Sequence, residues 1–150
     1  MTERVDFYVL KSAAARQRWA FACRLTEKAY LLDLNIVIAN DTLADARSLD
    51  ELLWTFNERS FVPHEVCADE HSMDPATKVH LMALPAPMPG ADLLVNLAGK
   101  LPEGWERYPR IAEIIDADEE RRRLGRERFK AYRDLKVALE THQLDDTAEI

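Results

Sequence analysis

The chain has 150 residues, of which 47% are hydrophobic and 31% are charged, and this balance predicts one globular domain that needs neither disulfides nor a metal for its core. Two cysteines are too few for the disulfide framework of a small secreted protein, and there is no signal-peptide pattern or apolar run of about 18 residues, so we expect a cytoplasmic protein without membrane contact. The net charge of −7 argues against a protein that coats nucleic acid, because phosphate binding depends on a basic surface.

The first elements alternate between strand and helix. Residues 5–10 are rich in β-branched and aromatic side chains, which predicts a strand. Residues 12–32 have an apolar face of helical period, which predicts a helix with Ser12 as its N-cap and Arg18 among the residues open to solvent. Residues 35–39 are apolar without alternation, as in a strand that is covered on both faces.

The middle of the chain predicts a helix, an extended piece and a strand. A capping-box pattern from Ser48 to Glu51 indicates that the helix begins near Ser48, with a shorter helical turn over residues 42–47 as an option before it. Residues 60–64 are predicted to be extended, and residues 78–84 have strand character.

The last part of the chain predicts two strands and one long helix. Residues 92–97 and 110–116 are the predicted strands. Residues 117–142 are predicted to form a single helix, whose acidic first turn suits the helix dipole. A proline-rich turn lies before residue 92, so residues 78–97 could also form a hairpin-like pair.

Strands that alternate with helices predict an α/β fold: a single Rossmann-like domain over residues 1–142, with a mostly parallel sheet flanked by helices on both faces. A hairpin within residues 78–97 would make the sheet mixed. Residues 143–150 are acidic and lack periodicity, so we predict a disordered tail there.

Positive charge is concentrated in one segment. Residues 121–136 hold eight basic and two acidic residues, a local charge of +6, and the remaining residues therefore carry −13. Arg122, Arg126, Lys130 and Arg133 share one helical face, with Phe129 beside them. This face is either a solvated surface or a site for an acidic partner, and a peptide with carboxylates and an apolar end would suit it.

A second feature is a group of large aromatic residues. Trp54, Phe56 and Phe61 lie within eight residues of one another, at the end of a predicted helix and in the connection after it. They either cover the sheet or form an exposed patch for a permanent protein partner.

The sequence predicts no catalytic residues, no cofactor and no metal. It has no glycine-rich phosphate loop and no nucleophile motif. His64, Cys67, Asp69 and His71 are four potential ligands within eight residues, but their spacing matches no common zinc pattern. Local packing is the favoured interpretation, and metal binding by His64, Cys67 and His71 stays open.

Several segments together resemble the chi subunit family of bacterial DNA polymerase III holoenzyme. The LDELLW, SFVPH and GRERFKAYR segments are specific as a set, and the resemblance runs in order from about residue 4 to 135. The segments that carry it are residues 7–10, 49–54, 60–64, 92–97, 113–116 and 125–133.

This resemblance implies a non-catalytic adaptor on a Rossmann-like fold that has lost nucleotide binding. In the family, one surface binds the psi subunit of the clamp-loader complex, and another binds the acidic, phenylalanine-ended C-terminal tail of single-stranded-DNA-binding protein. Nucleic acid is then contacted mainly indirectly. The residues matching the tail site are Ile115, Arg122, Arg126, Phe129 and Lys130.

The residues matching the psi surface are Trp54, Phe61, Val62 and Pro63. The same surface could serve a helicase-like repair protein where psi is absent. The rival hypothesis is a protein that binds single-stranded nucleic acid directly through the basic helix.

Overall fold

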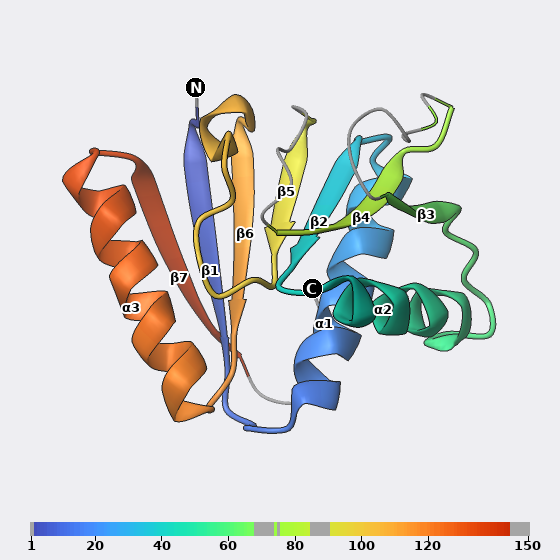
Figure 1. The fold of residues 1–150 in the computed structure, drawn as a ribbon, viewed down its shortest axis with the longest axis horizontal. Coiled ribbons are helices and arrows are strands. Elements are labelled where there is room, and N and C mark those ends of the chain that lie inside the picture. Colours follow the sequence, from blue (N-terminus) through green and yellow to red (C-terminus); the bar gives the residue numbers. More distant parts are fainter. Residues whose placement is uncertain (1, 68–73, 75, 85–90, 145–150) are drawn as a thin grey trace.

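The computed structural model describes residues 2–67, 74, 76–84 and 91–144, and these form a seven-stranded sheet with helices packed against it (Figure 1). In chain order the elements are β1 (Arg4–Leu10), α1 (Ala15–Leu31), β2 (Ile36–Asn40), α2 (Leu43–Thr55), β3 (His64–Cys67), β4 (Val79–Ala83), β5 (Leu93–Asn96), the short 3-10 helix η2 (Trp105–Arg107), β6 (Arg110–Ile115), α3 (Glu119–Asp134) and β7 (Ala138–Leu144). None of the described helices combines the length and apolar character needed to cross a membrane.

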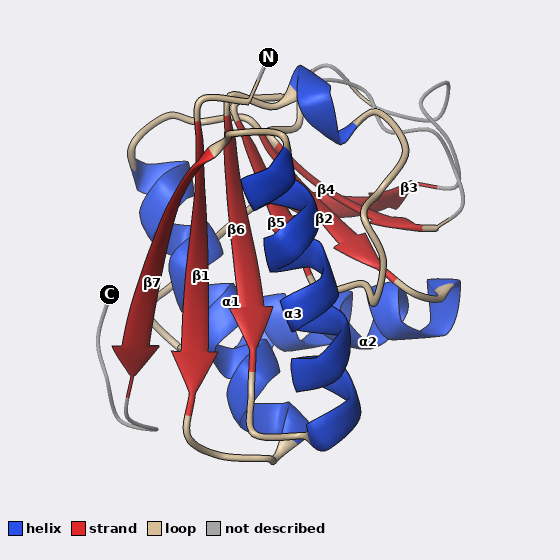
Figure 2. Cartoon of the chain, turned by 90° about the vertical axis from the view of Figure 1, so that its left-hand side faces the viewer, coloured by secondary structure: helices blue, strands red, loops and turns tan. Residues whose placement is uncertain are grey.

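The sheet is parallel throughout, in the order β3-β4-β2-β5-β6-β1-β7. Helices α1 and α2 cover one face, and α3 covers the other over β6, β1 and β7 (Figure 2). The predicted α/β fold with helices on both faces is confirmed. The mixed-sheet alternative is wrong, because β4 and β5 do not pair with each other and instead flank β2 on opposite sides.

The first two helices do not begin at the residues that the sequence predicts. Helix α1 begins at Ala15, and the Ser12 hydroxyl accepts the backbone N–H of Ala14 before the helix, at 3.0 Å. Helix α2 begins at Leu43, where the Thr42 hydroxyl caps the N–H of Asp45, so Ser48 lies inside the helix.

The C-terminal helix is shorter than the sequence predicts. Helix α3 ends at Asp134, and Lys136 takes a left-handed backbone with φ of 60°. The chain then forms β7, which pairs with β1 through Leu144, two residues beyond the predicted end of the domain at residue 142. Residues 143 and 144 of the predicted tail at 143–150 thus belong to β7, and residues 145–150 lie outside the described residues.

Arg18 is buried, although the sequence predicts it to be open to solvent. Its guanidinium donates to the backbone carbonyls of Leu97 and Ile114, each at 2.9 Å, and burial lowers its pKa to about 10. These carbonyls lie at or just after the carboxyl ends of β5 and β6, the edge where open α/β sheets bind ligands. The cavity beside Arg18 measures about 50 Å³, far below the roughly 300 Å³ of the smallest typical ligand pockets.

Side chains around Asp6 on β1 link this strand to its two neighbours, β6 and β7. The buried carboxylate of Asp6 accepts from Arg4 at 2.8 Å, His142 at 2.9 Å and Arg110 at 3.0 Å. Burial raises the pKa of Asp6, but these hydrogen bonds outweigh it and hold that pKa below its ordinary value of 3.8. The ionised carboxylate therefore stabilises the fold.

The substitution Asp6→Asn is expected to lower the free energy of unfolding by about 1–3 kcal/mol at pH 7. Because the folded-state pKa is depressed, this difference is fully present above the unfolded value near 3.8 and disappears as the pH falls through the folded value. Urea unfolding of both proteins at pH 7, 5 and 3 measures it. A difference that stays constant down to pH 3 would contradict the assignment.

Candidate peptide-binding pocket and aromatic patch

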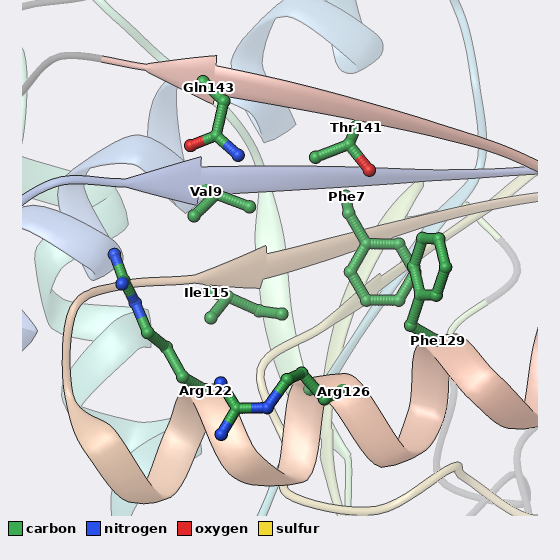
Figure 3. A pocket seen from close by; sticks show the side chains of 9 residues that line it. Phe7, Val9, Ile115, Arg122, Arg126, Phe129, Thr141 and Gln143 are labelled. Carbon is green, nitrogen blue, oxygen red and sulfur yellow. The ribbon is translucent and has the colours of Figure 1, made fainter.

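A pocket of about 230 Å³ lies between α3 and the strands β6, β1 and β7 (Figure 3). It is smaller than the roughly 300–1,000 Å³ typical of small-molecule sites. We call it the α3 pocket, and it is lined by Phe7, Val9, Ile115, Arg122, Gly125, Arg126, Phe129, Thr141 and Gln143.

Apolar side chains from the sheet and the helix form the floor of the α3 pocket. The rings of Phe7 and Phe129 meet edge to face with centroids 5.2 Å apart, which holds Phe129 against the sheet. Gly125 lets α3 approach β6 closely, since a Cβ at this position would overlap Cδ1 of Ile115. The floor thus offers aromatic and aliphatic carbon to a ligand.

The rim of the α3 pocket carries positive charge that the protein does not neutralise. On the same helix, carboxylates pair with Arg121, Arg123, Arg128 and Arg133. Among the described residues, no carboxylate lies within 4.0 Å of the side-chain nitrogens of Arg122, Arg126 or Lys130.

Arg122 has one intramolecular hydrogen bond at this rim, from its Nε to the carbonyl of Asp116 at 3.0 Å. Arg126 and Lys130 are exposed. Three of the four basic residues on the predicted helical face are therefore unpaired, and the fourth, Arg133, lies 3.9 Å from a carboxylate oxygen of Asp134.

Four of the five residues predicted for the tail site line the α3 pocket, namely Ile115, Arg122, Arg126 and Phe129. Lys130 follows Phe129 on the helix and does not line it. The sequence prediction missed the pocket residues of β1 and β7, including Phe7 and Thr141. Phe7 on β1 and Thr141 on β7 are direct register partners. The sequence predicts a helix up to residue 142, so it gave no indication of β7 and of this pairing.

A buried polar network anchors α3 beside the pocket. The carboxylate of Glu113 on β6 accepts from Arg128 Nε at 3.0 Å, Tyr132 Oη at 2.7 Å and Asn96 Nδ2 at 3.1 Å. Burial and the nearby carboxylate raise the pKa of Tyr132 well above its ordinary range, so its hydroxyl stays a donor. Arg128, in the middle of the basic segment, is thus a structural residue.

The aromatic patch consists of Trp54, Phe61 and Pro63. Trp54 is 45% exposed and Phe61 is 72% exposed, and their ring centroids lie 5.8 Å apart. The ring centroid of His64 lies 4.1 Å from that of Trp54, but the His64 side chain is buried. Pro63 is half-buried.

The other two residues near the patch belong to the core. Val62 is 1% exposed, so its side chain supports the patch from beneath and offers no contact surface. Phe56 also packs against the core under α1 and α2. Phe56 therefore covers the core, as one of the two interpretations of these aromatic residues has it, whereas Trp54 and Phe61 are exposed.

The metal ligands considered from the sequence do not converge among the described residues. His64 contacts a carboxylate oxygen of Asp50 on α2 at 3.0 Å, whereas Cys67 packs in the core on the other face of the sheet. Residues an odd number of positions apart on a strand face opposite sides, which explains the separation. Asp69 and His71 lie outside the described residues.

Comparison with known proteins places the chain in a family. The family model described as "DNA polymerase III chi subunit, HolC" matches residues 1–140. The chain belongs to this family of chi subunits. The resemblance found in the sequence is thereby confirmed, and the family is one of accessory, non-catalytic subunits in DNA replication.

Individual members of the family align with this chain over most of their length. The DNA polymerase III subunit chi of Pseudomonas aeruginosa is 34% identical over 143 residues, which cover 94% of this chain and 96% of the relative. The subunit chi of Haemophilus influenzae is 23% identical over 89% of this chain and 92% of its own. That of Escherichia coli is 24% identical over 74% of this chain and 75% of its own.

Proposed function

We propose that the protein is an adaptor in the cytoplasm that joins the clamp-loader complex of DNA polymerase III to single-stranded-DNA-binding protein. The α3 pocket would bind the acidic, phenylalanine-ended C-terminal tail of that protein. The aromatic patch would bind the psi subunit, or a helicase-like repair protein where psi is absent. DNA would then be reached through these partners.

The observation that carries the proposal is the pairing of an apolar floor with unneutralised cations at one small pocket. Arg122 and Arg126 stand at the rim above Phe7, Phe129 and Ile115. Guanidinium groups bind carboxylates through charge-assisted hydrogen bonds, and the floor would receive a phenyl ring. A short tail loses entropy on ordering, so we expect micromolar affinity, about −8 kcal/mol.

The alternative function is direct binding of single-stranded nucleic acid, and the experiment must distinguish it from peptide binding. The same cations could hold a few phosphates, but the charge of −13 on the rest of the chain would repel a longer strand. Bases stack on aromatic side chains along an open groove. Phe129 instead lies edge to face against Phe7 in a pocket of about 230 Å³.

The experiment is an anisotropy titration of a labelled acidic peptide ending in phenylalanine, at low and moderate salt. The proposal predicts saturable binding that weakens with salt, that is lost when the last residue is changed to alanine, and that oligo-dT does not displace. Tight oligo-dT binding without peptide binding would overturn it and favour the nucleic-acid alternative.

The substitution Gly125→Ala is expected to reduce peptide affinity by roughly fivefold, or about 1 kcal/mol. The added methyl displaces Ile115 from its place in the floor. Stability should change little, because alanine in a helix gains up to about 1 kcal/mol over glycine and offsets the strain. Anisotropy and thermal unfolding measure the two effects, and an unchanged affinity would show that Ile115 does not contact the peptide.

The substitution Phe61→Ala is expected to weaken binding of psi by at least about tenfold while leaving tail binding unchanged. The side chain is 72% exposed, so its loss should not disturb the core. Co-purification or calorimetry with psi measures the effect. Leu31→Ala, which removes a similarly exposed apolar side chain elsewhere, is the matched control. Loss of both partners in Phe61→Ala would mean that the two surfaces are not independent.

A further inference from the structure

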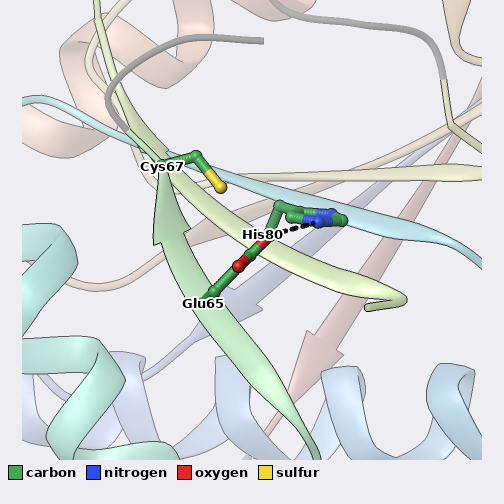
Figure 4. Close-up of side chains that lie close together, drawn as sticks. All are labelled: Glu65, Cys67 and His80. Atoms are coloured by element: carbon green, nitrogen blue, oxygen red, sulfur yellow. Dashed lines mark ion pairs between the residues drawn. The ribbon is translucent and has the colours of Figure 1, made fainter. Parts of the chain in front are cut away.

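Three side chains with metal-binding atoms converge at the sheet edge opposite β7. Glu65 and Cys67 lie two positions apart on β3, and so share one face of the strand. His80 on β4 is the direct register partner of Glu65. The Cys67 sulfur and the Glu65 carboxylate both point toward the imidazole of His80 (Figure 4).

The donor atoms of these residues all lie within 4.8 Å of one another, and Nε2 of His80 is 2.9 Å from a carboxylate oxygen of Glu65. In a tetrahedral zinc site with bonds of about 2.0–2.3 Å, ligand atoms are separated by roughly 3.3–3.8 Å. The observed separations of 2.9 Å and up to 4.8 Å lie on either side of these values. Side-chain rotations that move the donor atoms by about 1 Å would therefore bring all three onto one ion.

We propose that Glu65, Cys67 and His80 bind a zinc ion. Thiolate, imidazole and carboxylate are the ligand types that zinc takes from proteins, and the thiolate selects against magnesium and calcium. Cys67 is 1% exposed and His80 is 5% exposed, so the strands hold both residues in place before the ion arrives. Three protein ligands leave the fourth position of the ion for water.

Proton balance makes binding dependent on pH. The ion replaces the proton of the Cys67 thiol and binds His80 through a deprotonated ring nitrogen. In the described structure Nε2 of His80 lies 3.2 Å from the carbonyl of Asp74, and metal binding at Nε2 would replace this contact. Affinity should therefore rise with pH.

The second group of potential ligands is a built-in control. Asp6, Glu140 and His142 also cluster, but Arg4 and Arg110 already neutralise the carboxylate of Asp6, and the group has no thiol. A divalent cation there would have to displace these guanidinium groups. Its occupation would produce no thiolate signal.

The expected consequence is a firmer attachment of the edge strand. Strand β3 is hydrogen-bonded only to β4 within the described sheet, and residues 60–63 lead directly into it. An ion shared by β3 and β4 would link the two strands through side chains. Zinc at 100 times its dissociation constant should raise the Tm by about 5–10 °C.

The test titrates the reduced, metal-free protein with Co²⁺, a spectroscopic substitute for Zn²⁺, and follows the thiolate-to-cobalt charge-transfer band. The proposal predicts one equivalent of Co²⁺, a band that Zn²⁺ abolishes by competition, and at least about tenfold weaker binding in Cys67→Ser and His80→Ala. Cys23→Ala and His142→Ala, which alter the other thiol and the other cluster, should keep the band.

Two results would overturn the proposal. One is the absence of a charge-transfer band in the wild-type protein at millimolar Co²⁺, which needs no variant and so does not depend on whether the variants fold. The other is binding that Cys67→Ser leaves unchanged and His142→Ala abolishes, which would move the ion to the second cluster.

Discussion

Replacing Arg126 with alanine is expected to weaken binding of the acidic, phenylalanine-ended peptide by about 5- to 150-fold, or ~1–3 kcal/mol. Its guanidinium lines the α3 pocket, and no carboxylate among the described residues neutralises it. The peptide would supply the missing counter-charge. Because Arg126 is exposed and makes no ion pair in the described structure, the fold should be unaffected.

Arg123→Ala is the matched control for this prediction. It removes the same charge from the same helix, but Arg123 pairs with Glu120 and Glu127 and does not line the pocket. Anisotropy titrations at one salt concentration compare the two variants. Equal losses in both would mean that the helix attracts the peptide through its overall charge, which would contradict a defined binding site at the pocket.

Replacing Glu113 with alanine is expected to lower the free energy of unfolding by about 3–5 kcal/mol. The substitution leaves the buried guanidinium of Arg128 without a counter-charge, and it also deprives Tyr132 and Asn96 of their shared acceptor. An unpaired buried charge is costly, because its desolvation is no longer compensated. A Tm lower by on the order of 10 °C is the corresponding thermal result.

Glu127→Ala is the control for the buried network. Glu127 is an exposed acid on α3 that pairs with Arg123, and surface pairs of this kind contribute at most about 1 kcal/mol. Urea unfolding of both variants gives the comparison. A Glu113→Ala protein as stable as Glu127→Ala would contradict the view that this network fixes α3 against β6, and with it the shape of the pocket.

The helical side of the pocket was predictable from the sequence, because it depends on local spacing. Arg122, Arg126 and Phe129 recur at intervals that place them near one another on any helix. Strands β1, β2, β4, β5 and β6 were also recognisable, and β2 and β5 show the nearly continuous apolar runs of strands covered on both faces. Strand β3 was not predicted, because its four residues include His64 and Glu65.

The end of that helix was not predictable in the same way. Leu135 and Leu139 continue the helical spacing, and the left-handed residue that ends the helix is Lys136 rather than the usual glycine. The strand β7 that follows alternates only weakly and has one neighbour in the sheet. The contribution of β7 to the pocket was therefore hidden.

Hydrogen bonds to residues far away in the sequence explain why two arginines are buried. Arginines such as Arg18 and Arg128 are usually exposed, but the acceptors of both lie on β6 and in the loop that follows β5. Charge and helical position alone gave no indication of these contacts. The start of α2 was different, because Thr42 to Asp45 is itself a capping pattern, and buried Ala46 extends the apolar stripe one turn before Leu49.

The most direct test of the central claim is a ¹⁵N–¹H correlation titration of the labelled protein with the acidic, phenylalanine-ended peptide. The account predicts that the largest shifts fall on amides around the α3 pocket, including Gly125, Phe129 and Thr141, while those around Trp54 and Phe61 stay in place. A peptide lacking the terminal phenylalanine should lose the shifts of the pocket floor. Shifts concentrated at the aromatic patch, or the same shifts with both peptides, would contradict the claim.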